Sequence, residues 1–196
     1  MGLLVAVLTL IGAVNGRVLA VGRAVGVVAV ALMVAAILVQ VFFRYVLNNA
    51  LPWPDEAARF MMLWMTGLMA PTAFRRGGFV AIDTLPAYLP RALAGALNLI
   101  LLCVSLTVLI VAVQIGYKEV TGFGGRFATA SLYVPTTLDF SEWYRVPRSW
   151  MMLSLLVGVA LLIAVNIELL LRQIAALFGG AGRLPPIPHE NVVSAE

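Results

Sequence analysis

Two sets of charged side chains in this chain have a spacing that could do chemistry. Asp55 and Glu56 precede Arg59 by four and three residues, which lets carboxylates and a guanidinium meet on one helix face. Glu168 and Arg172 repeat the four-residue spacing. Such groups either form a fixed polar cluster that docks a partner or a lipid headgroup, or pair with each other at a membrane surface. For Glu168 and Arg172 we favour simple pairing.

Other chemistry is missing from the sequence. The only histidine, His189, lies in a polar segment near the C-terminus, so neither a haem held by two histidines nor a His-rich metal site can be built. A Ser-His-acid triad at membrane depth is excluded because no histidine lies there. A phosphate-binding loop is excluded because no glycine-rich stretch is followed by Lys and Ser or Thr. The single cysteine, Cys103, excludes an internal disulfide and a dithiol redox pair. We therefore expect a protein that is not an enzyme and that holds no cofactor or metal.

The elements that must position these side chains are strongly apolar. Hydrophobic residues make up 62% of the 196 residues and charged residues only 11%, against about half and about a quarter in a soluble domain. Four runs approach the roughly 20 apolar residues that a helix needs to cross a bilayer, and none has the two-residue alternation of a membrane barrel. We predict an all-α integral membrane protein with four transmembrane helices. They cover residues 24–43, 57–74, 92–113 and 150–171.

The four predicted helices form a single domain, residues 1–178, followed by a Gly- and Pro-rich mobile cytoplasmic tail, residues 179–196. Residues 1–14 are also apolar but short for a crossing, so they either lie in the membrane interface or lengthen the first helix through a tilt. A short interfacial segment is expected between helices two and three, around Pro86. The long loop 114–149 contains several aromatic residues and is expected to contact a partner.

The basic residues indicate the orientation of the chain. The net charge is +4, and the basic residues stand at the ends of the apolar runs, which favours membrane topology over nucleic-acid binding as their explanation. Four crossings place both termini on the same side. The short loop on that side carries Arg75, Arg76 and Arg91, whereas the short loop on the other side carries Arg44. We therefore expect both termini in the cytoplasm.

The start of the second predicted helix, together with its flanks, resembles a known family. QVFFRY closes the first helix, WPDEAARF begins the second, and RRGGFVAID follows it. This order is similar to that of the small membrane subunit of tripartite ATP-independent periplasmic (TRAP) transporters, the DctQ-like family, over roughly residues 23–173. The apolar N-terminal extension and the long outer loop depart from the family pattern. The matching residues are Gln40, Arg44, Tyr45, Trp53, Glu56, Arg59, Gly78 and Asp83.

The resemblance implies a role in transport across the bacterial inner membrane. In this family the small subunit is a fixed scaffold beside a large membrane subunit, which holds the substrate and sodium sites and moves in elevator fashion. A periplasmic solute-binding protein delivers the substrate, often an organic acid. The expected partners are those two proteins and membrane phospholipids, with no nucleic acid. Contacts with a partner or lipid are expected at Arg44, Tyr45, Trp53, Asp55, Glu56, Arg59, Arg75, Arg76 and Asp83.

Two alternatives stay open on the sequence alone. An autonomous four-helix channel or carrier would need several polar groups near the membrane midplane or a helix broken there. The deeper candidates are Thr66, Pro71, Ser105 and Thr107, which are typical of helix packing. A membrane enzyme or redox subunit would need a bound cofactor, which an optical spectrum of the purified protein would reveal.

Overall fold

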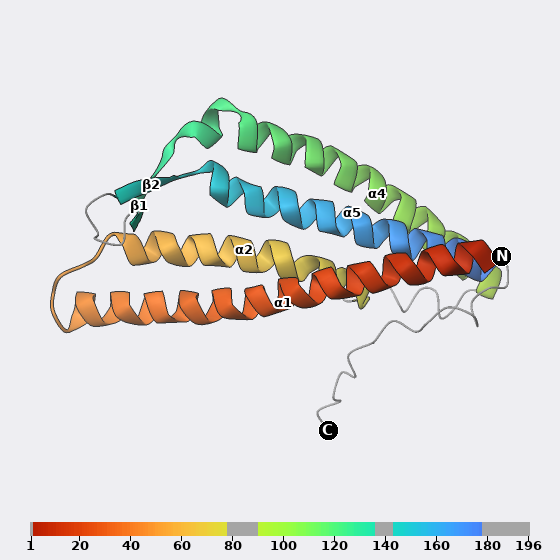
Figure 1. Cartoon of the computed structure of the whole chain (residues 1–196), viewed down its shortest axis with the longest axis horizontal. Helices are drawn as coiled ribbons and strands as arrows, with labels where there is room; N and C mark the ends of the chain where they lie inside the picture. Colours follow the sequence, from red (N-terminus) through yellow and green to blue (C-terminus); the bar gives the residue numbers. More distant parts are fainter. Residues whose placement is uncertain (1, 78–89, 136–142, 178–196) are drawn as a thin grey trace, which may run out of the picture.

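Four long helices make up the body of the protein (Figure 1). The computed structural model describes residues 2–77, 90–135 and 143–177. The expected interfacial segment and the tail at 179–196 lie outside the described residues, as do Gly78 and Asp83. The helices are α1 (Gly2–Tyr45), α2 (Trp53–Arg75), α4 (Arg91–Thr121) and α5 (Ser149–Leu177).

The helices lie in a row, in the order α1, α2, α5, α4 (Figure 1). Helix α2 packs against α1 on one side and α5 on the other, and α4 packs mainly against α5. The start of α1 and the end of α5 lie at the same end of the molecule's long axis. This arrangement leaves two broad helix faces instead of enclosing one central core.

Three helices are long and apolar enough to cross a membrane: Ala6–Tyr45, Leu93–Thr121 and Ser149–Leu177. A multi-pass membrane protein is therefore confirmed. The fourth predicted crossing, at residues 57–74, falls in α2, which does not reach the same apolar standard because it carries more polar and charged residues. Helix α2 begins with Pro52 at its N-cap and Pro54 in its first turn, where the missing N–H groups of proline cost nothing.

Helix α1 is far longer than the predicted crossing at 24–43. Its 44 residues span about 66 Å at 1.5 Å per residue, roughly twice the thickness of a hydrocarbon core. Of the two interpretations of residues 1–14, continuation of the first helix is the one the structure contains, and the separate interfacial segment is not. Helix α4 likewise extends beyond residue 113 to Thr121, and this shortens the outer loop.

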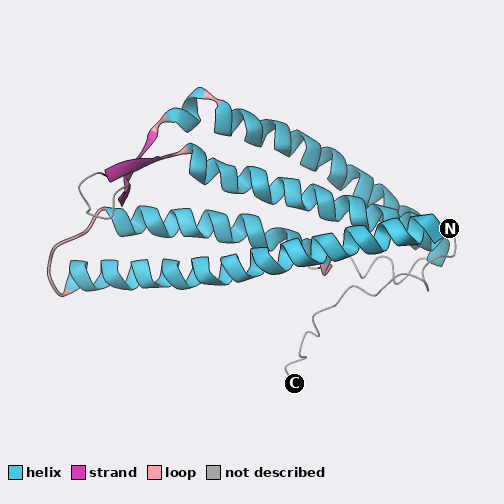
Figure 2. Ribbon diagram, in the orientation of Figure 1, coloured by secondary structure: helices cyan, strands magenta, loops and turns pink. Residues whose placement is uncertain are grey.

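A small antiparallel hairpin joins α4 to α5, where the sequence predicted only a long loop (Figure 2). A 3-10 turn, Phe123–Arg126, leads into β1 (Ala128–Pro135), which pairs with β2 (Trp143–Pro147). Tyr133 lies opposite Arg145, so the two side chains share one face of the hairpin. The Thr129 hydroxyl donates to the Val146 carbonyl at 2.7 Å, and Val146 is buried.

Glycines let the middle helices approach closely. A Cβ on Gly158 would lie 2.7 Å from the carbonyl oxygen of Gly67, and a Cβ on Gly67 would fall on the carbonyl oxygen of Ser154. In a membrane, where lipid is as apolar as the helix surface, helices gain stability from such close backbone packing. On α1, a Cβ on Gly26 would come within 2.9 Å of the Met69 side chain of α2. The row is therefore held by small residues at its crossings.

Candidate functional site

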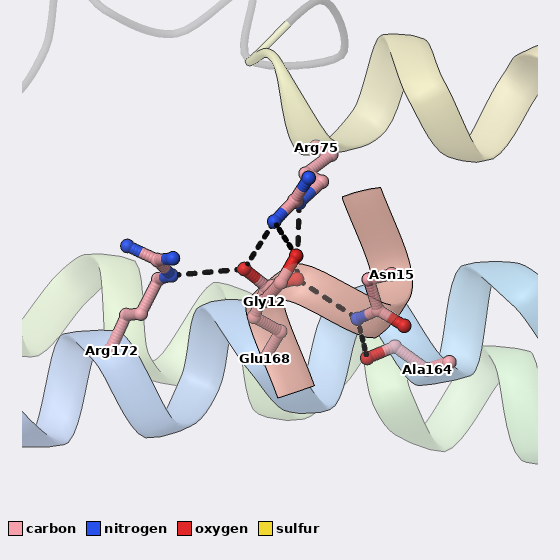
Figure 3. Close-up of polar contacts among 6 residues, drawn as sticks. All are labelled: Gly12, Asn15, Arg75, Ala164, Glu168 and Arg172. Atoms are coloured by element: carbon pink, nitrogen blue, oxygen red, sulfur yellow. Dashed lines mark hydrogen bonds and ion pairs between the residues drawn. The ribbon is translucent and has the colours of Figure 1, made fainter. Parts of the chain in front are cut away.

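A fully buried carboxylate, Glu168 of α5, lies toward the helix ends where α1 begins and α5 ends. Figure 3 shows its surroundings. Arg75, in the last turn of α2, grips both of its oxygens, with Nε 3.0 Å from Oε2 and Nη2 2.8 Å from Oε1. Arg172 of the same helix as Glu168 donates from Nε to Oε1 at 3.1 Å. The predicted pairing of Glu168 with Arg172 is thus confirmed, and Arg75 adds a second, bidentate ion pair.

Helix α1 completes this group, which we call the Glu168 cluster: Gly12, Asn15, Arg75, Glu168 and Arg172 (Figure 3). The Asn15 amide donates to Glu168 Oε2 at 2.9 Å and to the Ala164 carbonyl at 3.3 Å. Arg75 Nη2 also donates to the Gly12 carbonyl at 2.8 Å. The cluster therefore ties together α1, α2 and α5.

The Glu168 cluster has the features of a structural contact that holds helices together. A buried carboxylate is tolerated only when it is paired and its lone pairs are satisfied, which the two guanidiniums and the Asn15 amide achieve here. A Cβ on Gly12 would lie 3.0 Å from Arg172 Nη2 and 3.1 Å from Glu168 Oε1, so glycine leaves the room that the charges need. Because all these contacts are internal, the cluster fixes the relative positions of three helices.

A second carboxylate anchors the hairpin at the opposite end. Glu56, in the first turn of α2, accepts hydrogen bonds from the backbone N–H of Ala130 at 2.8 Å and from that of Ser131. The Ser131 hydroxyl lies 2.6 Å from Glu56 Oε2 and 2.8 Å from the Pro52 carbonyl oxygen. We call this group the Glu56 contact: Pro52, Glu56, Ala130 and Ser131.

The Glu56 contact favours the ionised carboxylate. Burial alone would raise the pKa of Glu56, but hydrogen bonds from the Ser131 hydroxyl and from the backbone of Ser131, Ala130 and Leu132 outweigh it and hold the pKa below its ordinary value of 4.5. The position in the first turn of α2 also places the negative charge at the positive end of the helix dipole. Next to it, Gln40 of α1 donates to Asp55 at 3.4 Å.

A cavity of about 730 Å³ opens between the hairpin and the start of α2. Its walls are mostly apolar, and three aromatic rings contribute to them. We call it the aromatic pocket. It is lined by Pro52, Trp53, Ala130, Ser131, Leu132, Tyr133 and Trp143.

Comparison with known families decides the identity of the chain. The sequence model of the DctQ component of tripartite ATP-independent periplasmic transporters matches residues 33–176, which is most of the chain. The chain belongs to this family. No match is found among curated proteins. The predicted resemblance to the small membrane subunit of TRAP transporters is therefore confirmed.

The predicted site residues of this DctQ component lie at both ends of the helices, near the Glu168 cluster and near the hairpin. Arg75 lies in the Glu168 cluster, and Trp53 lines the aromatic pocket beside Glu56. Arg44, in the last turn of α1, has its guanidinium carbon 5.9 Å from the centre of the Tyr45 ring. Arg76 follows α2, and its backbone N–H donates to the Thr72 carbonyl at 3.2 Å.

Arg59 has a different environment from the one its spacing suggested. In the described part of the chain it is exposed and makes no hydrogen bond or ion pair with Asp55 or Glu56. Glu56 instead turns to the hairpin and Asp55 to Gln40. The helical spacing permits the contact, but both carboxylates accept hydrogen bonds from donors on neighbouring elements instead.

The sequence reading missed Gly12, Asn15 and Ser131. Asn15 and Gly12 stand in the N-terminal run, whose helical continuation was one of two open interpretations. The spacing of Gly12 and Gly16, and again of Gly22 and Gly26, is the small-residue pattern of packed membrane helices. That signal could have placed the N-terminal run against its neighbours. Nothing local in the sequence points to Ser131.

Proposed function

We propose that this DctQ component is a non-catalytic scaffold for the large, elevator-type membrane subunit of a TRAP transporter. In this role it holds its own helices fixed while the large subunit, which carries the sodium and substrate sites, moves against it. It also helps dock the periplasmic solute-binding protein, so that the complex takes up an organic acid at the expense of a sodium gradient. It contributes no cofactor of its own.

The Glu168 cluster, read together with the family match, is the observation that carries this proposal. Charged side chains near membrane depth usually mark a function. Here their ion pairs and hydrogen bonds connect α1, α2 and α5. A rigid row with two broad apolar faces suits a protein that supports a moving neighbour. The hairpin, which Glu56 holds against the start of α2, offers a fixed surface for the solute-binding protein.

The proposal includes a topology in the bacterial inner membrane. We take α2 as the fourth crossing because it lies between α1 and α5, from the Glu56 contact at one end to the Glu168 cluster at the other. Both termini are then cytoplasmic, and the hairpin faces the periplasm. Arg75 and Arg76 at the cytoplasmic end agree with the positive-inside rule.

The test is a tagged purification from the native membrane in mild detergent, followed by mass spectrometry. We expect the large subunit in equal amount, and recovery of the solute-binding protein when substrate is added. Arg59→Gln is expected to reduce recovery of the large subunit without changing substrate choice, whereas Arg126→Gln, an exposed arginine in the turn before β1, serves as the matched control. A stable chain that purifies alone and conducts solute into liposomes would instead establish an autonomous channel or carrier.

A further inference from the structure

The aromatic pocket lies at the boundary of the membrane-crossing helices. Its lining includes Trp53, the first residue of α2, and residues of the hairpin strands, the second of which leads into α5 at Ser149. Aromatic side chains at such a boundary lie at the level of the lipid headgroups. The residues Trp53, Tyr133 and Trp143 are 42%, 48% and 55% exposed, so they are not part of a closed core.

One guanidinium stands at the edge of this pocket. Arg145 lies opposite Tyr133 and two residues after Trp143, so it shares the hairpin face of these two pocket residues. Its guanidinium carbon is 5.6 Å from the centre of the Tyr133 ring. The hairpin therefore presents a positive charge directly beside an apolar cavity.

The charge of Arg145 has no carboxylate partner among the described residues. Its Nε donates to the Thr129 carbonyl at 2.5 Å and its Nη2 to the Ala130 carbonyl at 2.6 Å, and both acceptors are uncharged. Glu56, the acid that contacts the same strand, directs its oxygens to the Ala130 and Ser131 N–H groups. Backbone carbonyls hold the guanidinium in place but do not neutralise it, which leaves it able to attract an anion.

We propose that the aromatic pocket and Arg145 form a binding site for an anionic phospholipid of the outer leaflet. An acyl chain fills the apolar cavity, whose volume of about 730 Å³ is within the usual range for ligand sites. The headgroup phosphate lies against Arg145. A lipid fits better than a protein partner because the site lies at the level of the headgroups and is open to its surroundings. It also combines an apolar cavity for an acyl chain with a single guanidinium for a phosphate. The choice of the outer leaflet rests on the proposed topology, whereas the pocket and Arg145 do not depend on a role in transport.

The test uses the purified full chain in detergent and native mass spectrometry during titration with phosphatidylglycerol or phosphatidylcholine of identical chains. We expect about fivefold tighter binding of phosphatidylglycerol, the effect of one cationic residue near a charged headgroup. Arg145→Gln is expected to abolish this preference and Arg145→Lys to retain most of it. Protection of the Ala130 and Ser131 amides from hydrogen exchange reports whether the hairpin stays docked in each variant.

A second pair of variants tests the cavity itself. Ala130→Phe fills the pocket, while the hydrogen bonds of Ala130 are unaffected because they use its backbone. Val134→Phe is the control, since Val134 is not among the pocket residues and lies opposite Tyr144. We expect Ala130→Phe to lose bound lipid and Val134→Phe to keep it.

Three results would overturn the proposal. The first is equal binding of the two lipids by the unaltered chain, and the second is an unchanged lipid preference in Ala130→Phe with a docked hairpin. The third is an Ala130→Phe variant that keeps its lipid but no longer recovers the solute-binding protein, which would make the pocket a protein contact. Recovery of the large subunit is measured separately, so failure of the lipid site and failure of the scaffold function are distinguishable.

Discussion

At the scale of single residues, Glu168 is a carboxylate that is removed from solvent and held by charged partners. It is fully buried, and each of its oxygens accepts a hydrogen bond from Arg75. Arg172 and Asn15 complete the set of donors. Removing one partner from such a group is costly because the remaining charges stay buried without compensation.

We predict that Glu168→Gln lowers the free energy of unfolding by about 3–5 kcal/mol, since it leaves two guanidiniums facing an uncharged amide. The measurement is reversible unfolding in detergent micelles. Glu119→Gln makes the same chemical change at an exposed position of α4, and we expect less than about 0.5 kcal/mol from it. Equal effects of the two substitutions would contradict a fastening role for Glu168.

Glu56 makes the docking of the hairpin depend on pH. Its pKa in the folded protein lies below 4.5, because hydrogen bonds from Ser131 and neighbouring N–H groups outweigh the effect of burial. A lowered carboxyl pKa stabilises the fold above the ordinary value, and this contribution is lost as the pH falls through the folded pKa. We therefore expect the hairpin to loosen from α2 only below about pH 4.5.

This prediction is checked by hydrogen exchange at the Ala130 and Ser131 amides, corrected for intrinsic rates, between pH 7 and pH 3. Protection should fall on acidification in the unaltered chain. Glu56→Gln should show reduced protection at pH 7 and no further loss on acidification. Retention of full protection at pH 3 would show that the carboxylate is not what holds the hairpin.

At the scale of elements, the crossing of α2 and α5 depends on two glycines. Gly67 and Gly158 face each other so closely that a methyl group on either would meet backbone atoms of the other helix. Backbone atoms cannot turn aside as a flexible side chain can. The separation of the two helices is therefore determined at this point.

We predict that Gly67→Ala destabilises the protein by about 1–3 kcal/mol, the usual cost of overpacking, by pushing α5 away from α2. Gly116→Ala is the matched control in α4, because its new methyl would lie 3.5 Å from Leu156 at ordinary contact distance. Thermal unfolding of both variants in the same detergent gives the comparison. A neutral Gly67→Ala would mean that the two helices are not in this close contact.

At the scale of the whole molecule, the row arrangement separates α1 from α4. These helices are the two outer members of the row, with α2 and α5 between them (Figure 1). In a closed four-helix bundle they would be neighbours. The row therefore leaves far more apolar helix surface for lipid or for the large subunit.

Cross-linking distinguishes the two arrangements. In a Cys103→Ser background, a cysteine pair at Asn98 and Gln173 should react readily with a short bifunctional thiol reagent, since these side chains are hydrogen-bonded at 3.2 Å between α4 and α5. A pair at Val28 of α1 and Val108 of α4, both exposed, should not react within one chain. Efficient linkage of the second pair would indicate a closed bundle.

The amino-acid sequence alone determined the membrane class, the helical architecture and the family. These follow from local properties, because the length of an apolar run is matched to the bilayer and the motif from Gln40 to Arg59 lies in one short stretch. The pairing of Glu168 with Arg172 was equally local, one helical turn apart. The start of α1 could not be decided locally, since an apolar run of that length suits both an interface and a helix extension.

Only the tertiary structure decided which groups meet across the row. Arg75 and Glu168 are 93 residues apart, and Glu56 and Ser131 are 75 apart. Their contacts depend on how closely α2 approaches α5 and on where the hairpin folds back. Helical spacing placed Arg59 within reach of Asp55 and Glu56, but it carries no information about competing donors on distant elements. Gln40 of α1 supplies the donor for Asp55 and the hairpin supplies the donors for Glu56, so both contacts depend on how separate elements pack together.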